Sequence, residues 1–119
     1  MKESEIARLL DAQIHTPFNP DLELKSACGA DLMSDVMAFV KEDVVLLTGL
    51  VNIQTVRTAQ LLDIPLVIFV RGKVPSPEMV AEAQKAGVAL MTTQTTLFLA
   101  CGKLFEAGLR RGGTRLSDE

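Results

Sequence analysis

Three loops of this 119-residue sequence carry the residue types that bind a small anion. They lie at residues 48–52, 71–73 and 92–96, and each of them follows an apolar run. Hydroxyl groups, exposed backbone amides and cationic side chains are the donors from which phosphate sites are built. These types also have purely structural uses, because Thr and Asn cap helices and Gly allows tight turns. The candidate ligand-binding residues of the three loops are Thr48, Gly49, Asn52, Arg71, Thr93 and Thr95.

Two carboxylates form a second candidate ligand site. Asp31 and Asp35 are one helical turn apart in a segment with helical periodicity, so we expect them on one face of a helix. There they could share a proton or a cation. The structural alternative is that Asp31 is the N-cap of this helix and Asp35 a first-turn acid that faces the helix dipole.

The sequence contains no recognisable catalytic or metal-binding motif. It has no P-loop, no Gly-X-Gly-X-X-Gly and no serine beside its single histidine, His15, which we expect in a polar turn without a fixed partner. The two cysteines, Cys28 and Cys101, lack the spacing of a metal site and are expected to be buried, reduced thiols. We therefore predict no catalytic residue, no metal and no cofactor.

Strands and helices in alternation must position the three loops. Apolar runs at 44–47, 66–70 and 88–91 predict strands, and each is followed by a segment with helical periodicity. Because the runs are continuously apolar, we expect helices on both faces of a parallel sheet. The predicted fold class is α/β, a three-layer α/β/α single domain with a mostly parallel sheet built from βα units. Ligands of such sheets bind at the carboxyl ends of the strands, where the three loops lie.

The predicted helices have recognisable ends. A helix at 31–40 is followed by one that Asn52 caps and by one that starts at Ser76-Pro77 and stops at Gly87. A last helix follows Thr96. Its residues expected to face the core are Leu97, Phe98, Cys101, Leu104 and Phe105.

The two ends of the chain are less regular. Within residues 1–28 we expect a helix at 3–10, a short strand at 13–16 and an edge strand at 22–26. Residues 110–119 are polar and contain Gly112-Gly113, so we expect a frayed tail. We find no repeat and no linker, and predict one domain over residues 1–119.

Composition excludes several classes of protein. With 48% hydrophobic and 23% charged residues the chain is typical of a globular protein. Fifteen acidic residues outnumber twelve basic ones and there is no Trp or Tyr to stack on a base, so we expect no nucleic-acid partner. The longest apolar run, at 64–70, is too short to span a membrane, and the N-terminal residues lack a signal peptide. We predict a cytoplasmic protein without a membrane partner.

Residues 29–109 resemble the DRTGG domain family, in particular its stand-alone single-domain members. The resemblance rests on segments 29–36, 47–53 and 66–72 and on the helix start at Ser76. The same module is similar to the N-terminal domain of HPr kinase, the middle domain of some phosphotransacetylases and the regulatory insert of nucleotide-controlled pyrophosphatases. The resemblance implies a three-layer α/β module that has a regulatory or assembly role and no catalytic one. The name-giving Asp-Arg-Thr-Gly-Gly stretch is replaced here by Thr-Gly-Leu-Val-Asn, so no specific nucleotide is implied.

The predicted function is a non-catalytic regulatory or ligand-sensing module. We expect it to bind a small anionic, nucleotide- or phosphate-like ligand or a partner protein as a homodimer. The resemblance suggests self-association, which would cover aliphatic residues such as Leu50, Val51 and Leu99. The alternatives are a structural or assembly subunit of a larger redox or kinase complex, and a small enzyme that uses Asp31 and Asp35.

Overall fold

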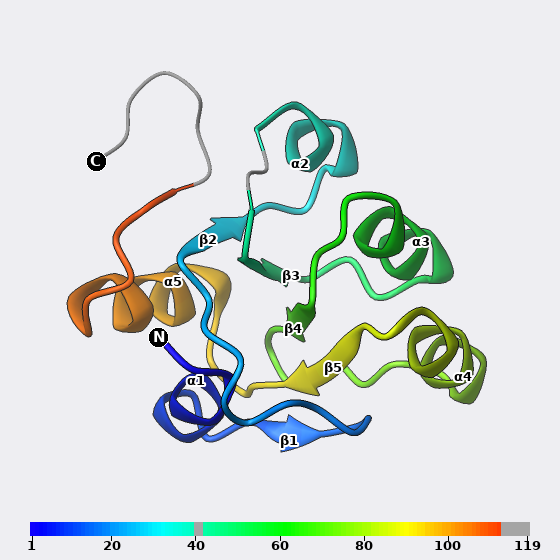
Figure 1. The fold of residues 1–119 in the computed structure, drawn as a ribbon, viewed down its shortest axis with the longest axis horizontal. Coiled ribbons are helices and arrows are strands. Elements are labelled where there is room, and N and C mark those ends of the chain that lie inside the picture. Colours follow the sequence, from blue (N-terminus) through cyan, green and yellow to red (C-terminus); the bar gives the residue numbers. More distant parts are fainter. Residues whose placement is uncertain (40–41, 113–119) are drawn as a thin grey trace.

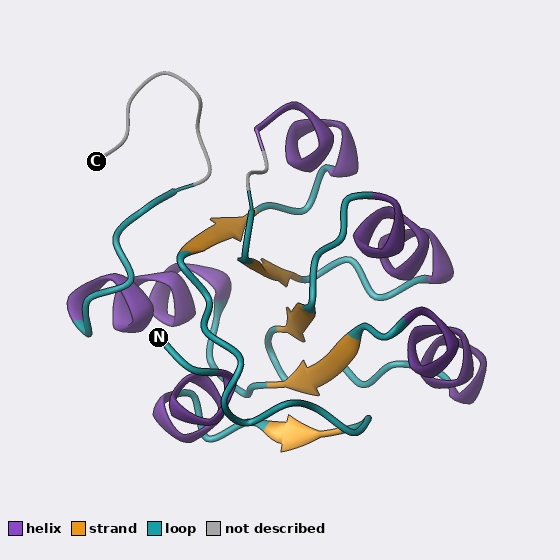
Figure 2. Cartoon of the chain, viewed as in Figure 1, coloured by secondary structure: helices purple, strands orange, loops and turns teal. Residues whose placement is uncertain are grey.

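The structure, a computed structural model, describes residues 1–39 and 42–112 of the chain. Helices and strands alternate over most of this length (Figures 1 and 2). In chain order they are α1 (Glu3–Leu9), β1 (Gln13–Ile14), β2 (Ser26–Gly29), α2 (Met33–Phe39), β3 (Val44–Thr48), α3 (Ile53–Leu61), β4 (Leu66–Phe69), α4 (Pro77–Ala86), β5 (Ala89–Thr92) and α5 (Leu97–Glu106).

The five strands form one sheet in the order β1-β5-β4-β3-β2. Strands β2 to β5 are parallel, and each lies beside the strand that follows it in the sequence, whereas β1 pairs antiparallel with β5. Helices α2, α3 and α4 cover one face of the sheet, and α1 and α5 cover the other (Figure 1). The predicted three-layer α/β/α fold class is thus confirmed. Within residues 1–39 and 42–112, no helix has the length and hydrophobicity needed to cross a membrane.

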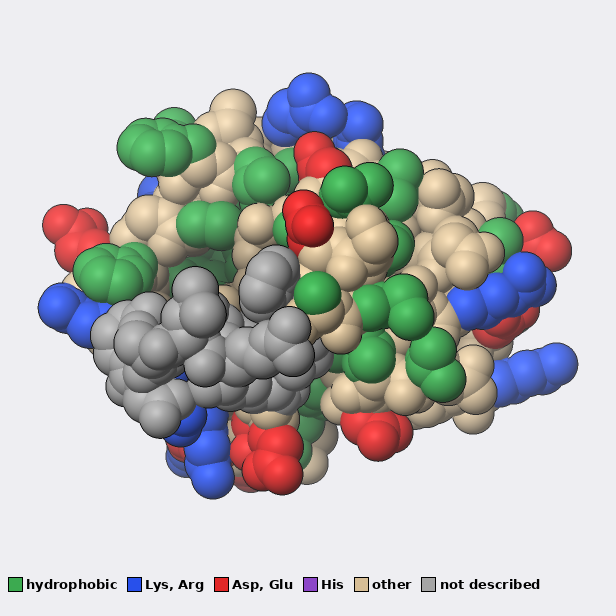
Figure 3. Space-filling model, turned by 90° about the horizontal axis from the view of Figure 1, so that it is seen from above, with side chains coloured by type: hydrophobic (Ala, Val, Ile, Leu, Met, Phe, Trp, Pro, Cys, Tyr) green, Lys and Arg blue, Asp and Glu red, His purple; other side chains and the backbone are tan. Residues whose placement is uncertain are grey.

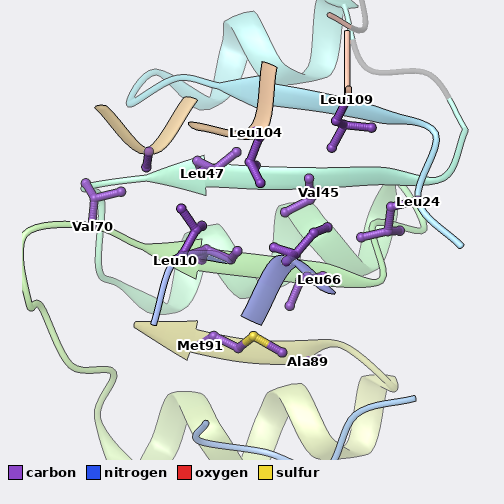
Figure 4. Packing of buried hydrophobic residues seen from close by; sticks show 13 residues of the cluster. Leu10, Leu24, Val45, Leu47, Leu66, Val70, Ala89, Met91, Leu104 and Leu109 are labelled. Carbon is purple, nitrogen blue, oxygen red and sulfur yellow. The ribbon is translucent and has the colours of Figure 1, made fainter. Parts of the chain in front are cut away.

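Each face of the sheet has its own hydrophobic core, because alternate strand residues point to opposite faces. In β3, Val45 and Leu47 belong to the core beneath α1 and α5, while Leu46 belongs to the core beneath α2, α3 and α4. Figure 4 shows the first core, in which Leu104 of α5 lies close to Leu47 and Val45. All residues of β3, β4 and β5 are buried, as their continuous apolar runs predicted.

The capping residues of α3 and α4 act as predicted. The Asn52 side chain accepts a hydrogen bond from the Thr55 amide at 3.0 Å, and Ser76 accepts one from the Met79 amide at 3.2 Å. Gly87 ends α4 with a φ of +74°, a conformation in which a residue with a Cβ is strained. Local side-chain chemistry therefore sets where these helices begin and end.

The predicted inward face of α5 is partly wrong. Ala100 and Leu104 are fully buried and Leu97 and Cys101 are half-buried, but Phe98 is 84% exposed and Phe105 is 54% exposed. At 100° of helical rotation per residue, the two phenylalanines lie about a third of a turn from the midpoint between Ala100 and Leu104. The helix is apolar over a wider arc than the sheet covers, so part of its apolar surface faces outward.

Other expected elements shift by a few residues. The helix expected at 31–40 is α2, which begins only at Met33, while residues 40–41 lie outside the described residues. The edge strand expected at 22–26 is instead β2, whose short stretch of small residues gives no apolar pattern. In the expected C-terminal tail, the Arg111 carbonyl accepts a hydrogen bond from the Ala27 amide at 2.9 Å. Residues 113–119 lie outside the described part.

Candidate functional site

The carboxyl ends of β2 to β5 lie along one edge of the sheet because these strands are parallel. The chain leaves β4 toward α4 on one face and leaves β5 toward α5 on the other face (Figure 1). In α/β sheets, such a divergence between neighbouring strands is where ligand crevices form. The three predicted loops are therefore neighbours in space, with the 71–73 and 92–96 loops on either side of the divergence.

Hydrogen bonds join the loops on the two sides of this divergence. The Arg71 amide donates to the Thr95 carbonyl and the Gly72 amide donates to the Thr93 carbonyl, both at 2.9 Å. The Gln94 side chain packs against Gly72, where a Cβ would approach its Oε1 to 2.6 Å. Backbone and glutamine atoms thus fill the space between β4 and β5, so the available surface lies above β3 and β4.

Arg71 is held over this surface by a tight turn. Arg71 and Gly72 both have positive φ values, +58° and +71°, and the Lys73 amide donates to the Val70 carbonyl at 3.3 Å. For a residue with a Cβ this conformation is uncommon and costs about 1 kcal/mol or more. The Arg71 Nη2 atom lies 3.1 Å from the position of a Cβ on Gly49, so its guanidinium rests against that glycine.

Two cationic groups meet at Gly49. The Lys73 Nζ donates to the Gly49 carbonyl at 3.0 Å and keeps further N–H donors. The Arg71 guanidinium makes no hydrogen bond or ion pair with the residues that the structure describes. None of its five N–H donors has a partner among the described residues, so all five can serve a ligand. Sequence inspection singled out Arg71 but did not include Lys73 among the candidate residues, although it stands only two positions later.

Asp31 already occupies the backbone donor that an external anion would use. Its Oδ1 accepts from the Gly49 amide at 2.7 Å and from the Thr48 hydroxyl at 3.2 Å. The prediction that Asp31 caps a helix is wrong, because α2 begins at Met33 and the Asp31 carboxylate turns to the neighbouring strand end. Asp35 lies in the first turn of α2, so helical register does not place the two carboxylates on one face.

The remaining predicted hydroxyl and amide groups are engaged within the protein. The Thr93 hydroxyl donates to the Leu10 carbonyl at 2.7 Å, toward the α1 side of the sheet. The Thr95 amide donates to the Thr93 hydroxyl at 3.3 Å, and the Asn52 side chain caps α3. Of the predicted ligand-binding residues, Arg71 therefore offers the clearest unsatisfied donors, and Thr93 points elsewhere.

His15 has a fixed partner, contrary to expectation. Its Nε2 lies 2.7 Å from the Thr92 hydroxyl, which donates in turn to the Lys73 carbonyl at 2.7 Å. Nε2–H is therefore the donor, and burial lowers the pKa of His15, which favours the neutral ring. The sequence predicts a short strand at 13–16, but only the pairing of β1 with β5 brings His15 to Thr92.

The described residues hold no group of three or more His, Cys, Asp or Glu that could bind a metal ion. Cys28 and Cys101 are free and half-buried rather than fully buried, and they belong to opposite faces of the sheet. Burial raises the pKa of both thiols, so they are protonated at neutral pH. Neither cysteine contributes to the strand-end surface.

The fold and this surface define an α/β module with a cationic patch at its strand ends. A solved structure with the same fold is that of the CBS and DRTGG domains of the regulatory region of Clostridium perfringens pyrophosphatase, complexed with its activator, diadenosine tetraphosphate. The TM-score is 0.70 at 19% sequence identity, over 87% of this chain and 45% of that chain. The chain thus spans about half of that regulatory region. No family model and no curated protein matches the sequence.

Proposed function

We propose that this protein is a non-catalytic regulatory module that binds a small anion of the nucleotide or phosphate-ester class at the ends of β3 and β4. The observation that carries the proposal is the Arg71 guanidinium, held against Gly49 and without a partner among the described residues. Lys73 adds a second cation at the same glycine. An arginine fork and a lysine ammonium are the side chains that proteins most often direct at phosphate oxygens.

The structural neighbour supports this class of ligand. Its regulatory region was solved with diadenosine tetraphosphate, a polyanionic nucleotide, and its fold matches over most of the present chain. A likeness at 19% sequence identity supports only the shared fold, so the proposed position of the anion rests on Arg71 and Lys73.

An enzymatic role for Asp31 and Asp35 is less well supported. Catalysis by two carboxylates requires both to face one reacting group. The Asp31 carboxylate instead accepts two hydrogen bonds within the protein, and Asp35 is on a separate helix. The regulatory character of the structural neighbour also favours a role without catalysis.

We further propose that the module acts as a homodimer through α5. Phe98, Leu99 and Phe105 are all more than half exposed on this helix. Figure 3 shows exposed hydrophobic side chains on the side of the molecule where α5 lies, at the upper left and above the grey segment in this view. Large exposed aromatic side chains are typical of interfaces, and a second copy would bury them in a self-complementary contact.

Thermal denaturation with inorganic phosphate, ADP, ATP and diadenosine tetraphosphate tests the anion site. A ligand that binds only the folded state raises the melting temperature as its concentration exceeds the Kd. We expect stabilisation by at least one nucleotide, and Arg71→Ala should weaken its binding about ten- to hundredfold. Lys85→Ala is the matched control, because it removes an equal charge at the far end of α4.

Three outcomes would contradict the proposal. Unchanged nucleotide affinity in Arg71→Ala would place the ligand elsewhere on the molecule. Equal losses in Arg71→Ala and Lys85→Ala would show that only net charge matters. If no anion stabilises the protein at millimolar concentration, a partner protein becomes the better hypothesis for this surface.

A further inference from the structure

A cavity of about 480 Å³ lies at the edge of the sheet opposite to the strand-end surface, where β4 and β5 begin. The start of α1, the loop before β2 and the end of α4 contribute its walls. A volume of this size is within the range of small-molecule sites. Its apolar lining residues are Pro17, Phe18, Leu22, Pro65, Val88 and Ala89.

Glu3 is the one charged residue among those that line this cavity. Its side chain is almost completely buried, at 1% exposure, and one carboxylate oxygen, Oε1, accepts from the Asn19 amide at 3.2 Å. The other oxygen, Oε2, makes no hydrogen bond or ion pair with the described residues. Among those residues no fully buried side-chain oxygen lacks a partner. Oε2 is therefore not fully enclosed by the described part of the protein, and Glu3 is one of the residues that line the cavity.

A carboxylate in this setting lacks a counter-charge. Burial raises the pKa of Glu3 to about 7, and the hydrogen bond from Asn19 opposes this rise only in part. No Lys, Arg or His is among the cavity residues. A buried carboxylate is rarely retained without a charged partner, because its ionised form loses more hydration energy than a single hydrogen bond restores. A cation placed on Oε2 would supply the missing interaction.

We propose that this cavity binds a small organic cation, whose apolar body contacts Phe18, Leu22 and Val88 and whose N–H groups donate to Glu3. An amidinium, guanidinium or ammonium group on a ring or short aliphatic body has this chemistry. The planar forms match a carboxylate best, because they present parallel N–H donors. The site lies at the other end of the strands from Arg71, so this proposal is independent of the anion site.

Benzamidinium is a suitable probe, since it joins a flat apolar ring to a permanently charged fork of N–H donors. Benzamide is its matched neutral control, with the same ring and nearly the same shape. We expect benzamidinium to shift the backbone amide resonances of Phe18, Val88 and Ala89 in a titration followed by two-dimensional NMR. Benzamide should bind at least about tenfold more weakly, because it cannot form the charge-assisted pair with Glu3.

Three variants complete the test. Glu3→Gln should weaken benzamidinium binding by about tenfold or more, while Glu106→Gln, on the exposed end of α5, should leave it unchanged. Gln84→Lys adds a cation to the exposed part of the cavity wall and should also weaken benzamidinium binding. This variant provides a second measurement if Glu3→Gln fails to fold. Equal affinities for benzamidinium and benzamide, or resonance shifts confined to other surfaces, would overturn the proposal.

Discussion

Asp31 shows how a residue expected to bind a ligand can serve the protein itself. Its carboxylate ties the segment before α2 to the end of β3 through Gly49 and Thr48. An anion that binds near Gly49 must therefore use side-chain donors. These are the Arg71 guanidinium, which packs against Gly49, and the Lys73 ammonium, which donates to the Gly49 carbonyl. The site differs in this way from the phosphate loops in which backbone amides provide most of the contacts.

Replacement of Asp31 should destabilise the fold. Asp31→Ala removes an acceptor from the Gly49 amide and the Thr48 hydroxyl, and we expect a loss of about 1–2 kcal/mol in the free energy of unfolding. Urea denaturation measures this loss. Asp35→Ala is the matched control and should change stability by less than about 0.5 kcal/mol. Equal losses in the two variants would contradict the structural role of Asp31.

Glu3 predicts a dependence of stability on pH. Burial raises its pKa from 4.5 to about 7 in the folded state, so the folded protein holds this proton more tightly than the unfolded chain. The stabilisation that the protonated Glu3 adds to the free energy of unfolding is therefore fully present below pH 4.5. It is lost as the pH rises through 7, and the free energy of unfolding no longer changes through Glu3 at higher pH. Its upper limit is about 3 kcal/mol.

Comparison of the wild type with Glu3→Gln isolates this contribution. Between pH 4.5 and 7.5, the stability of Glu3→Gln relative to the wild type should rise, because the variant has no carboxyl to ionise in a buried place. Chemical denaturation at several pH values measures the slope. A relative stability that is independent of pH would show that the Glu3 carboxyl is well solvated or paired.

At the scale of helices, two glycines should respond to the same substitution with opposite sign. Gly87 ends α4 with a φ of +74°, and Gly102 lies within α5; a Cβ on either would meet open space. Gly87→Ala should lower the free energy of unfolding by about 1 kcal/mol, because the strain of the left-handed conformation is unrelieved. Gly102→Ala should raise it by about 0.5–1 kcal/mol through helix propensity. Melting temperatures that move in the same direction would contradict this account.

The elements that were predictable from sequence are those with strong local signals. Strands β3, β4 and β5 are continuously apolar because helices bury both of their faces, and Asn52 and Ser76 cap their helices through bonds to amides three residues away. The face of α5 was not predictable in full, because its apolar arc exceeds the arc that the sheet covers. Phe98 and Phe105 lie in the excess.

The candidate site was predictable in position but not in detail. Parallel strands bring the loops together, so the sequence alone predicts that Arg71 lies near Gly49, as it does in the structure. The partners of Asp31 and His15 depend on contacts between segments far apart in the sequence, which no local pattern encodes. The cavity beside Glu3 was missed for the same reason, because its walls come from four separate segments.

At the scale of the whole molecule, the exposed face of α5 predicts self-association. Light scattering should give twice the mass of a single chain at micromolar concentrations. Phe98→Asp should shift the mass toward one chain, because a carboxylate would then have to be desolvated in the contact. Leu61→Asp is the matched control: Leu61 is 68% exposed on α3, and its replacement should leave the mass unchanged. A single-chain mass for the wild type would contradict the homodimer.

The pairing of β1 with β5 has a consequence for synthesis on the ribosome. Strands β2 to β5 can join the sheet one after another as they emerge, because each pairs with the strand made just before it. The segment of α1 and β1 emerges before these strands, yet the partner of His15 is 77 residues further along the chain. Ile6 and Leu10 share a core with Met91 of β5 and Leu104 of α5, so this core is incomplete until both elements have left the exit tunnel. A segment that is made before β2 to β5 is thus among the last parts of the described fold to complete its packing.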